Sequence, residues 1–386
     1  MRPKVNSAWR SYVRAAVLPV LVSLAGLAAC TSTGPPPLTD LNALPTNTAK
    51  VLWRERVGPV GVGFVSALID DRLWIANQRG EVMALDPATG ETLGDFDLDR
   101  ELSTGVAGDE STLVVVDADG NMLGVDPTGK ERWTVDLGAE PLTIPVIQAG
   151  QVLVRLSNST IVSYDLASGQ RRWLFAEQNP ALVLRQNAAI SADFSNAYVG
   201  LANGRVVAIS LSTGASRWQA RISSPRGANE IERITDVMGS PVLTGAGVCA
   251  AAYQGRLTCV DSTNGQELWT EDVNAGTSVA IDSRVMVVGD VDGGLRAFTR
   301  SQLPLWEQNA LRGRRIANPA LIGEHVWVGD AGGVIHVLDR TDGRVTGRIE
   351  TNESPIVSAP VAIDAGGSTT AFAMTADGHV VAMTLQ

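Results

Sequence analysis

An all-β fold, an eight-bladed β-propeller of four-stranded antiparallel blades, is the fold class that this 386-residue sequence predicts. Three observations predict it. A residue that ends an apolar strand before a Ser/Thr-Gly turn recurs about every 40 residues, a glycine turn precedes most of these residues, and a tryptophan follows most of them. Composition agrees, because 45% hydrophobic residues, 39 Gly and only 19% charged residues suit a compact, turn-rich β protein.

The strand-ending residue, called the marker below, defines the repeat. Its eight occurrences are Asp86, Asp126, Asp165, Ser210, Asp261, Thr299, Asp339 and Thr384. Successive markers are 40, 39, 45, 51, 38, 40 and 45 residues apart. Units of this length are typical of propeller blades, so the markers predict eight blades.

Each unit carries the same turn chemistry. Several residues before the marker, two β-rich runs are separated by a turn ending in glycine, at Gly80, Gly120, Gly204, Gly255, Gly293 and Gly378. In the turn after the strand, a marker Asp can accept hydrogen bonds from nearby backbone N–H groups, while the Gly takes a positive φ that a side chain would resist. We therefore expect two hairpin turns in each blade.

The tryptophans form a third column. Seven or eight residues after a marker come Trp133, Trp173, Trp218, Trp269 and Trp306, and a Trp there can lie flat between adjacent sheets. Prolines recur before short apolar runs upstream of the units, at Pro145, Pro241, Pro319 and Pro360. Because proline lacks a ladder donor, these runs are expected to be inner edge strands.

Ring closure is predicted from the two ends of the propeller, which spans residues 50–386. The last unit stops at Gln386, straight after its third strand. The run VLWRERV places Trp53 in the tryptophan column with no marker before it. This N-terminal strand is expected to complete the last blade.

The first 29 residues read as a secretory signal. A basic segment precedes the apolar run of residues 15–27, which is too short to span a bilayer with its flanks. The run ends in Leu-Ala-Ala-Cys, which resembles the bacterial lipobox and predicts that Cys30 becomes the acylated (palmitate-bearing) N-terminus; ordinary cleavage after Ala29, leaving a free thiol, is the alternative. Thr31 favours outer-membrane sorting, and residues 30–49 are expected to be a flexible tether in the periplasm.

Charge excludes one class of partner. The signal carries four basic and no acidic residues, so its removal changes the formal charge from −10 to −14. An acidic surface without a basic stripe repels phosphate backbones, and nucleic-acid binding is not expected.

The segments at residues 117–121 and 290–294 look like calcium loops but lack the twelfth-position Glu and fall on the turn column. His325, His336 and His379 have no metal-ligand spacing, so no metal site is predicted.

Cys249 and Cys259 are the remaining cysteines. A hairpin turning around residues 253–255 would place them opposite each other on neighbouring strands. A two-residue turn would instead put them one register apart, on opposite faces. A disulfide therefore remains open at this stage.

Departures from the repeat predict where recognition lies. The long spacings around the fourth marker fall in two links, residues 176–187 and 223–239, which should emerge on one face of the disc. The first link offers Leu182, Leu184 and Arg185, and the second offers Glu232, Arg233 and Asp236. An apolar centre with arginine and a charged rim is typical of a protein interface. The alternative is that the two leucines tuck under the propeller.

The blade motif resembles the repeat of the pyrroloquinoline quinone (PQQ) dehydrogenases. The sequence lacks their adjacent-cysteine pair and the extra length that builds their site, so a PQQ-dependent oxidoreductase is only an alternative function. The lipobox, LVLR (182–185), EIERITDV (230–237) followed by Pro241, and AYQGRLTCVDSTNGQELW (252–269) together resemble the BamB family, lipoprotein subunits of the outer-membrane β-barrel assembly (BAM) machinery.

That resemblance implies a scaffold without catalysis or cofactor, anchored in the outer membrane and facing the periplasm. It implies docking to the POTRA domains of BamA through Leu182, Leu184, Arg185 and Asp236, and contact with unfolded outer-membrane proteins by β-augmentation. Met238 stands where the family often has a second acid. A cell-wall-associated propeller lipoprotein is a further alternative.

Overall fold

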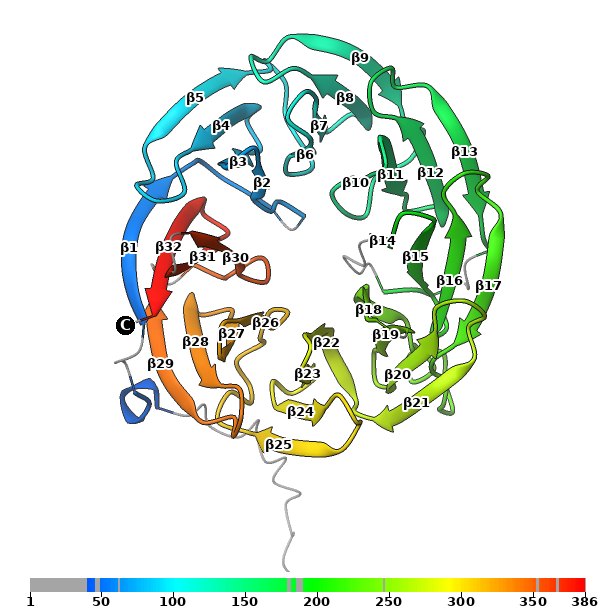
Figure 1. Ribbon diagram of the computed structural model, residues 1–386, viewed down its shortest axis with the longest axis vertical. Helices are drawn as coiled ribbons and strands as arrows, with labels where there is room; N and C mark the ends of the chain where they lie inside the picture. Colours follow the sequence, from blue (N-terminus) through cyan, green and yellow to red (C-terminus); the bar gives the residue numbers. More distant parts are fainter. Residues whose placement is uncertain are drawn as a thin grey trace, which may run out of the picture. The chain divides into compact units, whose positions relative to one another are not determined.

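Eight four-stranded antiparallel sheets form the computed structural model, arranged radially around a central channel (Figure 1). The structure describes residues 40–45, 49–61, 63–178, 182–184, 190–245, 247–351, 354–365 and 368–385. Within these ranges it contains no α-helix, and one 3₁₀ turn, η1 (Leu41–Ala43), precedes the first strand. The predicted eight-bladed propeller is confirmed. The predicted signal peptide, Cys30 and most of the tether lie outside the described residues.

The blades follow the chain, each running from an inner to an outer strand. Blade 1 is β2 (Ala67–Ile69), β3 (Arg72–Ala76), β4 (Glu81–Leu85) and β5 (Thr92–Asp97). Blade 2 is β6 (Ala107–Gly108), β7 (Leu113–Val116), β8 (Asn121–Val125) and β9 (Glu131–Asp136). Blade 3 is β10 (Val146–Gln148), β11 (Gln151–Arg155), β12 (Thr160–Asp165) and β13 (Arg171–Ala176). Blade 4 is β14 (Ser191–Ala192), β15 (Asn196–Leu201), β16 (Arg205–Ser210) and β17 (Ser216–Arg221).

The second half repeats the order. Blade 5 is β18 (Val237–Leu243), β19 (Gly247–Ala252), β20 (Arg256–Asp261) and β21 (Glu267–Asp272). Blade 6 is β22 (Ala275–Ile281), β23 (Val285–Asp290), β24 (Leu295–Thr299) and β25 (Pro304–Gln308). Blade 7 is β26 (Ala320–Ile322), β27 (His325–Gly329), β28 (Val334–Asp339) and β29 (Val345–Glu350). Blade 8 is β30 (Val361–Ala365), β31 (Ser368–Met374), β32 (His379–Leu385) and β1 (Ala49–Arg56).

Blade 8 closes the ring as predicted. Its outer strand β1 pairs antiparallel with β32, from Ala49 opposite Leu385 to Arg56 opposite His379. Figure 1 shows the two ends of the chain's colour range, blue and red, side by side in this blade. The pairing spans nearly the whole of both strands, so the N-terminal strand is an integral part of the last sheet.

The tryptophan column joins neighbouring blades. Five indole N–H groups donate to a backbone carbonyl of the next blade at 2.7–3.1 Å: Trp53 to Pro87, Trp133 to Leu166, Trp173 to Leu211, Trp218 to Ser262 and Trp306 to Arg340. Each ring also lies against the turn glycine of that next blade, where an added Cβ would come within 2.5–2.9 Å of a ring atom (Gly90, Gly169, Gly214, Gly265 and Gly343). We call each such Trp–Gly pair a fastener.

Two other interfaces, between blades 5 and 6 and between blades 1 and 2, lack a complete fastener. Blade 6 has no turn glycine after Thr299, and Trp269 instead packs edge-on against Phe298 with ring centroids 5.4 Å apart. Blade 1 has Gly94 in the tryptophan column, and Phe96 covers Gly129 of blade 2. The fasteners are therefore not uniform around the ring.

Turn chemistry follows the prediction. The marker Asp86 accepts hydrogen bonds from the N–H groups of Ala88 and Thr89 at 2.8 and 2.9 Å, and Gly90 has φ = 78°. These bonds lower the pKa of Asp86 below its usual value. The carboxylate and the glycine thus shape the turn that leads into the outer strand.

Candidate docking surface

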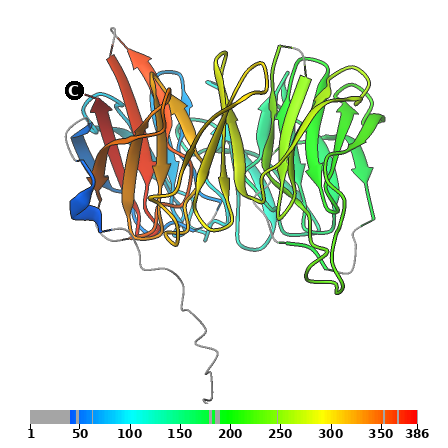
Figure 2. The same cartoon turned by 90° about the horizontal axis from the view of Figure 1, so that it is seen from below.

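Two long connections between blades lie on one face of the propeller. The first link, residues 177–190, joins β13 to β14, and the second link, residues 222–236, joins β17 to β18. In an antiparallel four-stranded blade, such outer-to-inner connections emerge on the same face as the turns between the second and third strands. Figure 2 shows the second link, in green, extending below the lower face of the propeller. The predicted common face is therefore observed for the described parts of both links.

The first link presents leucine to solvent. Leu182 is 45% exposed, whereas Val183 and Leu184 are only partly exposed and line a cavity beneath the link. One leucine therefore points outward and one tucks inward, so each of the two sequence-based alternatives describes part of the link. Arg185 lies outside the described residues.

The second link is a compact, self-bonded loop. The Glu232 carboxylate accepts hydrogen bonds from the Ala228 N–H at 2.7 Å and the Asn229 side chain at 2.9 Å. The Arg233 guanidinium donates to the Gly227 carbonyl at 3.1 Å and pairs with Glu230 at 3.4 Å. Both charged residues thus shape the loop as well as facing solvent.

Ile231 is the apolar tip of this loop. It is 71% exposed, and sequence reasoning did not single it out. Its signal is an isoleucine between two glutamates in a link. We define the link surface as residues 182–184 together with residues 227–234.

Asp236 and Met238 lie behind the link surface. They are only 5% and 7% exposed, so neither offers the exposed contact expected from the sequence. The physical reason is internal bonding: the Asp236 carboxylate accepts from the Leu184 N–H at 2.6 Å and from the Asn203 N–H at 3.1 Å. Met238 is buried because it belongs to the inner strand β18.

Arg155 supplies the opposite charge. It lies at the end of β11 and lines the same cavity of about 270 Å³ as Asp236, with Ser157, Ser159 and Leu184. Burial lowers the pKa of Arg155 to about 10, and the Asp236 charge opposes that shift. Burial raises the pKa of Asp236, opposed by the two N–H donors and by Arg155. Sequence reasoning missed Arg155, because nothing in β11 distinguishes it from other strand-end arginines.

The two cysteines are joined. Cys249 on β19 and Cys259 on β20 are directly opposite in the register and form a disulfide. The hairpin turns at residues 253–255, the longer of the two turns considered from the sequence. The disulfide lies in blade 5, whose inner strand directly follows Asp236.

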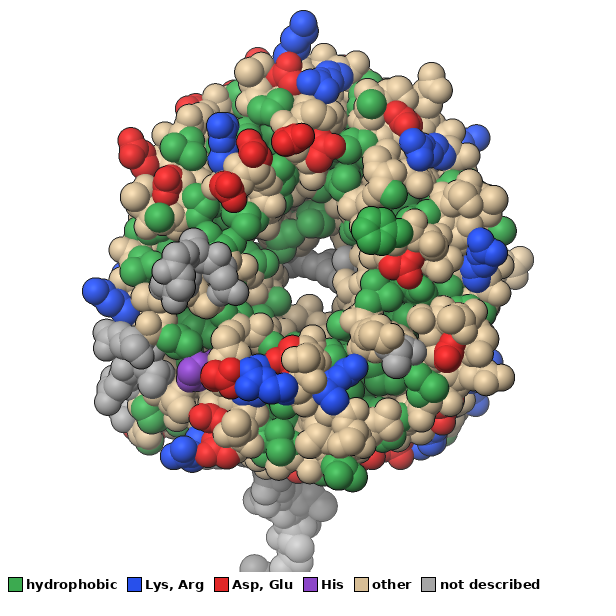
Figure 3. Space-filling view, in the orientation of Figure 1, with side chains coloured by type: hydrophobic (Ala, Val, Ile, Leu, Met, Phe, Trp, Pro, Cys, Tyr) green, Lys and Arg blue, Asp and Glu red, His purple; other side chains and the backbone are tan. Residues whose placement is uncertain are grey.

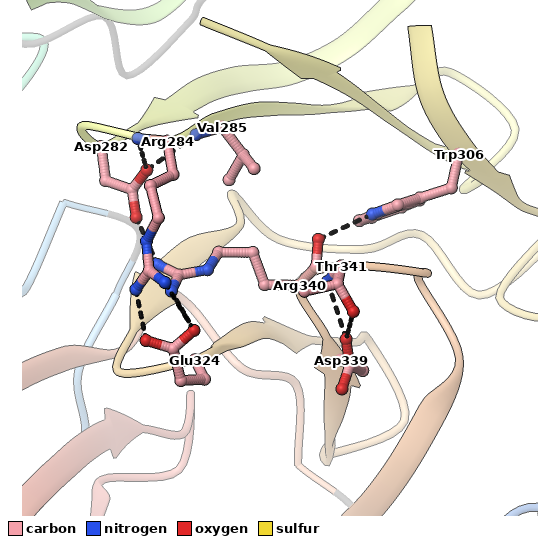
Figure 4. Close-up of polar contacts among 8 residues, drawn as sticks. All are labelled: Asp282, Arg284, Val285, Trp306, Glu324, Asp339, Arg340 and Thr341. Atoms are coloured by element: carbon pink, nitrogen blue, oxygen red, sulfur yellow. Dashed lines mark hydrogen bonds and ion pairs between the residues drawn. The ribbon is translucent and has the colours of Figure 1, made fainter.

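Charged clusters elsewhere are paired within the protein. Figure 4 shows Arg340 reaching both Asp282 and Glu324, and Glu324 also pairs with Arg284. The Arg340 carbonyl accepts the Trp306 indole, so this cluster joins blades 6 and 7. His336 is fully buried and its Nε2 lies 2.9 Å from the Asp330 carboxylate. Among the described residues, no group of three or more His, Cys, Asp or Glu side chains is placed to hold a metal.

The cavity in the central channel is lined, among the described residues, by uncharged side chains. A cavity of about 460 Å³ is bordered by side chains such as Ser66, Thr143, Ser240 and Asn318 and by several valines. Figure 3 shows hydrophobic side chains beside the central opening and acidic and basic side chains farther out on the face, several of them clustered below the opening. Among the described residues, no helix is long and apolar enough to cross a membrane.

Sequence comparison decides the family. A sequence profile described as "Outer membrane protein assembly factor BamB" matches residues 78–303. The curated protein of that description from Bordetella pertussis is 33% identical over 360 residues, which is 92% of each chain. This chain belongs to the BamB family.

Solved structures agree with the BamB assignment. The crystal structure of BamB from Moraxella catarrhalis matches with a TM-score of 0.78 and 27% identity, over 87% of this chain and 99% of that one. A quinohemoprotein alcohol dehydrogenase from Comamonas testosteroni matches with a TM-score of 0.65 at 14% identity, over 87% of this chain and 76% of that one. The second likeness shows a shared propeller fold alone.

Proposed function

We propose that this BamB-family protein is a scaffold of the BAM complex without catalytic activity of its own, and that its link surface docks on the POTRA domains of BamA. The observation that carries the proposal is the pair of exposed apolar residues, Leu182 and Ile231, held on neighbouring links of one face. Apolar anchors ringed by charge are typical of the central part of a protein interface. The resemblance to the BamB family adds Arg185, which follows the apolar run of the first link, to the proposed contacts.

Membrane attachment is part of the same proposal. Acylation at Cys30 would anchor the chain in the outer membrane, and the polar, proline-rich segment up to residue 49 would act as a tether in the periplasm. Unfolded outer-membrane proteins are proposed as clients that pair with exposed outer strands. The outer strand β5, whose residues are almost all exposed, supplies such an edge.

A pull-down tests the docking partner. The full-length lipoprotein, affinity-tagged, is captured from solubilised outer membrane and its partners are identified by mass spectrometry. BamA is expected in the wild-type capture and is expected to be lost with Leu182→Asp or Ile231→Asp, because a charge replaces an apolar anchor. Capture of cell-wall components in place of BamA would favour the cell-wall-associated alternative.

Phe194 provides a matched control. It is 90% exposed in the turn between β14 and β15, which the strand order places on the face opposite the links. Phe194→Asp introduces the same charge at an exposed apolar position and should leave BamA capture unchanged. Equal loss with all three variants would contradict the assignment of the link surface.

The quinone-dehydrogenase alternative is not supported by the channel. Pyrroloquinoline quinone carries several carboxylates, which need cationic or strongly donating partners. The lining of the described channel cavity contains no Arg, Lys or His. These residues do not fit the quinone, so we derive no oxidoreductase chemistry from the shared fold.

A further inference from the structure

One buried aspartate behind the link surface bonds to three separate parts of the chain. Asp236 Oδ2 accepts from the Leu184 N–H of the first link, and Oδ1 accepts from the Asn203 N–H in the turn after β15 of blade 4. The Asp236 carbonyl accepts from the Tyr253 N–H of blade 5 at 2.8 Å. One residue therefore ties the first link to the bodies of blades 4 and 5.

The two hydrogen bonds to the Asp236 carboxylate come from backbone N–H groups far away in the chain. Its two donors, Leu184 and Asn203, are 52 and 33 residues away in the chain. By contrast, Asp330, buried at the end of blade 7's second strand, accepts from the N–H groups of Gly332 and Val334 in its own turn. Asp330 shapes a local turn, whereas Asp236 fixes a distant link.

A buried carboxylate needs compensation for its lost hydration. Two backbone N–H donors supply part of it, and a nearby guanidinium supplies the rest. Arg155 comes from β11 of blade 3, lines the same cavity and acts on the Asp236 charge. The charge balance therefore depends on a residue that is not itself part of the exposed link surface.

We propose that Arg155 is a positioning residue of the link surface: its guanidinium neutralises the Asp236 carboxylate, which holds Leu184 and thereby keeps the apolar run of residues 182–184 in one conformation. The proposal rests on the proposed docking function for its consequence, a preorganised surface that loses less conformational entropy on binding. The internal contact itself is a property of the free protein.

Hydrogen exchange of the free, full-length protein tests the internal contact. Without the guanidinium, the carboxylate is expected to leave the cavity for water and release the Leu184 N–H. A hydrogen bond to a charged group contributes about 1.5–3 kcal/mol, so amide exchange at Leu184 in Arg155→Leu should be about ten- to a hundredfold faster. Arg155→Lys keeps the charge and should restore most of the protection.

A matched control separates this effect from general loss of an arginine. Arg172, on the outer strand β13 of the same blade, pairs at 2.6 Å with Asp165 at the end of β12, and both side chains are partly exposed. Arg172→Leu should leave Leu184 exchange unchanged. If Arg155→Leu fails to fold, Arg155→Leu with Asp236→Asn removes both buried charges, and exchange at Leu184 should lie between the wild type and Asp236→Ala.

Binding to the BamA POTRA domains is the second readout. Arg155→Leu is expected to weaken binding at least about tenfold while Arg155→Lys binds nearly as the wild type. Unchanged Leu184 exchange in folded Arg155→Leu, or equal loss with Lys and Leu, would overturn the proposal. If wild-type protein does not bind the POTRA domains but Arg155→Leu still releases Leu184, the positioning role stands and the proposed partner is wrong.

Discussion

Replacing Trp173 with alanine should open the interface between blades 3 and 4. The indole is only 7% exposed, and its N–H donates to the Leu211 carbonyl at 2.7 Å and to Gln151 Oε1 at 3.2 Å. Truncating a buried tryptophan to alanine removes about 3–5 kcal/mol of unfolding free energy. Urea denaturation followed by circular dichroism measures the loss as a lower midpoint.

The expected loss of unfolding free energy on removing Trp173 has a packing part and a hydrogen-bonding part. Trp173→Phe keeps most of the apolar area but leaves the buried Leu211 carbonyl without its donor, so its expected loss is about 1–3 kcal/mol. Leu174→Ala is the control, because the neighbouring Leu174 is 49% exposed and its truncation should change stability by about 0.5 kcal/mol or less. A wild-type midpoint for Trp173→Ala would refute the fastener interpretation.

The glycine partner extends the test. A Cβ at Gly214 would lie 2.8 Å from the Trp173 Cβ, and Gly214 has φ = 72°. Gly214→Ala should therefore destabilise the wild type through the backbone strain and through clashes with the Cβ and the ring of Trp173, the ring atoms lying at 2.9 Å. In Trp173→Ala, which keeps its Cβ, the same change should cost less because the clash with the ring is gone. A coupling of about 0.5–3 kcal/mol is expected in the double-mutant cycle. Additive losses would show that the ring and the glycine do not act as a unit.

Three further predictions concern the ring and its chemistry. Deleting residues 50–57 should lower the melting temperature of the whole domain, because β1 completes blade 8; an unchanged melting temperature would refute closure. Replacing both Cys249 and Cys259 with alanine should remove about 2–3 kcal/mol in urea denaturation, since the bridge closes a short loop, and an unchanged midpoint would contradict this. Bonds from Arg172 and Ser168 lower the Asp165 pKa to about 2, below its ordinary value near 4, so the stability that ionised Asp165 contributes is present above pH 4 and lost as pH falls toward 2. The difference in unfolding free energy between wild type and Asp165→Asn should therefore shrink from pH 4 to pH 2, and a constant difference would contradict this prediction.

The blades could be predicted because each carries its own local signal. The marker Asp bonds to N–H groups two or three residues on, and the turn glycine needs its positive φ locally, so both leave a pattern at a fixed spacing. Trp53 could be assigned to blade 8 although it lies at the other end of the chain. Trp53 lies in a β-rich run with no marker before it, and the last unit ends after its third strand, so the two ends complement each other.

The link surface was predictable only in outline. Spacing located the links, but a link has no periodicity that tells an exposed residue from a buried one. Asp236 was therefore grouped with Glu232 and Arg233, whereas its carboxylate turns inward to donors 33 and 52 residues away. Ile231 and Arg155 were missed for the same reason. The exposure of one and the charge pairing of the other arise only when blades 3, 4 and 5 come together.

The central claim is that the irregular links, and not the repeated fasteners, carry recognition. Its most direct test is a calorimetric titration of the purified POTRA domains of BamA into two variants. Ile231→Asp should abolish measurable binding while keeping the wild-type melting temperature. Trp306→Phe, which weakens the fastener between blades 6 and 7 and leaves both links untouched, should melt at a lower temperature yet bind with wild-type affinity. Wild-type binding by Ile231→Asp, together with lost binding by folded Trp306→Phe, would contradict the account.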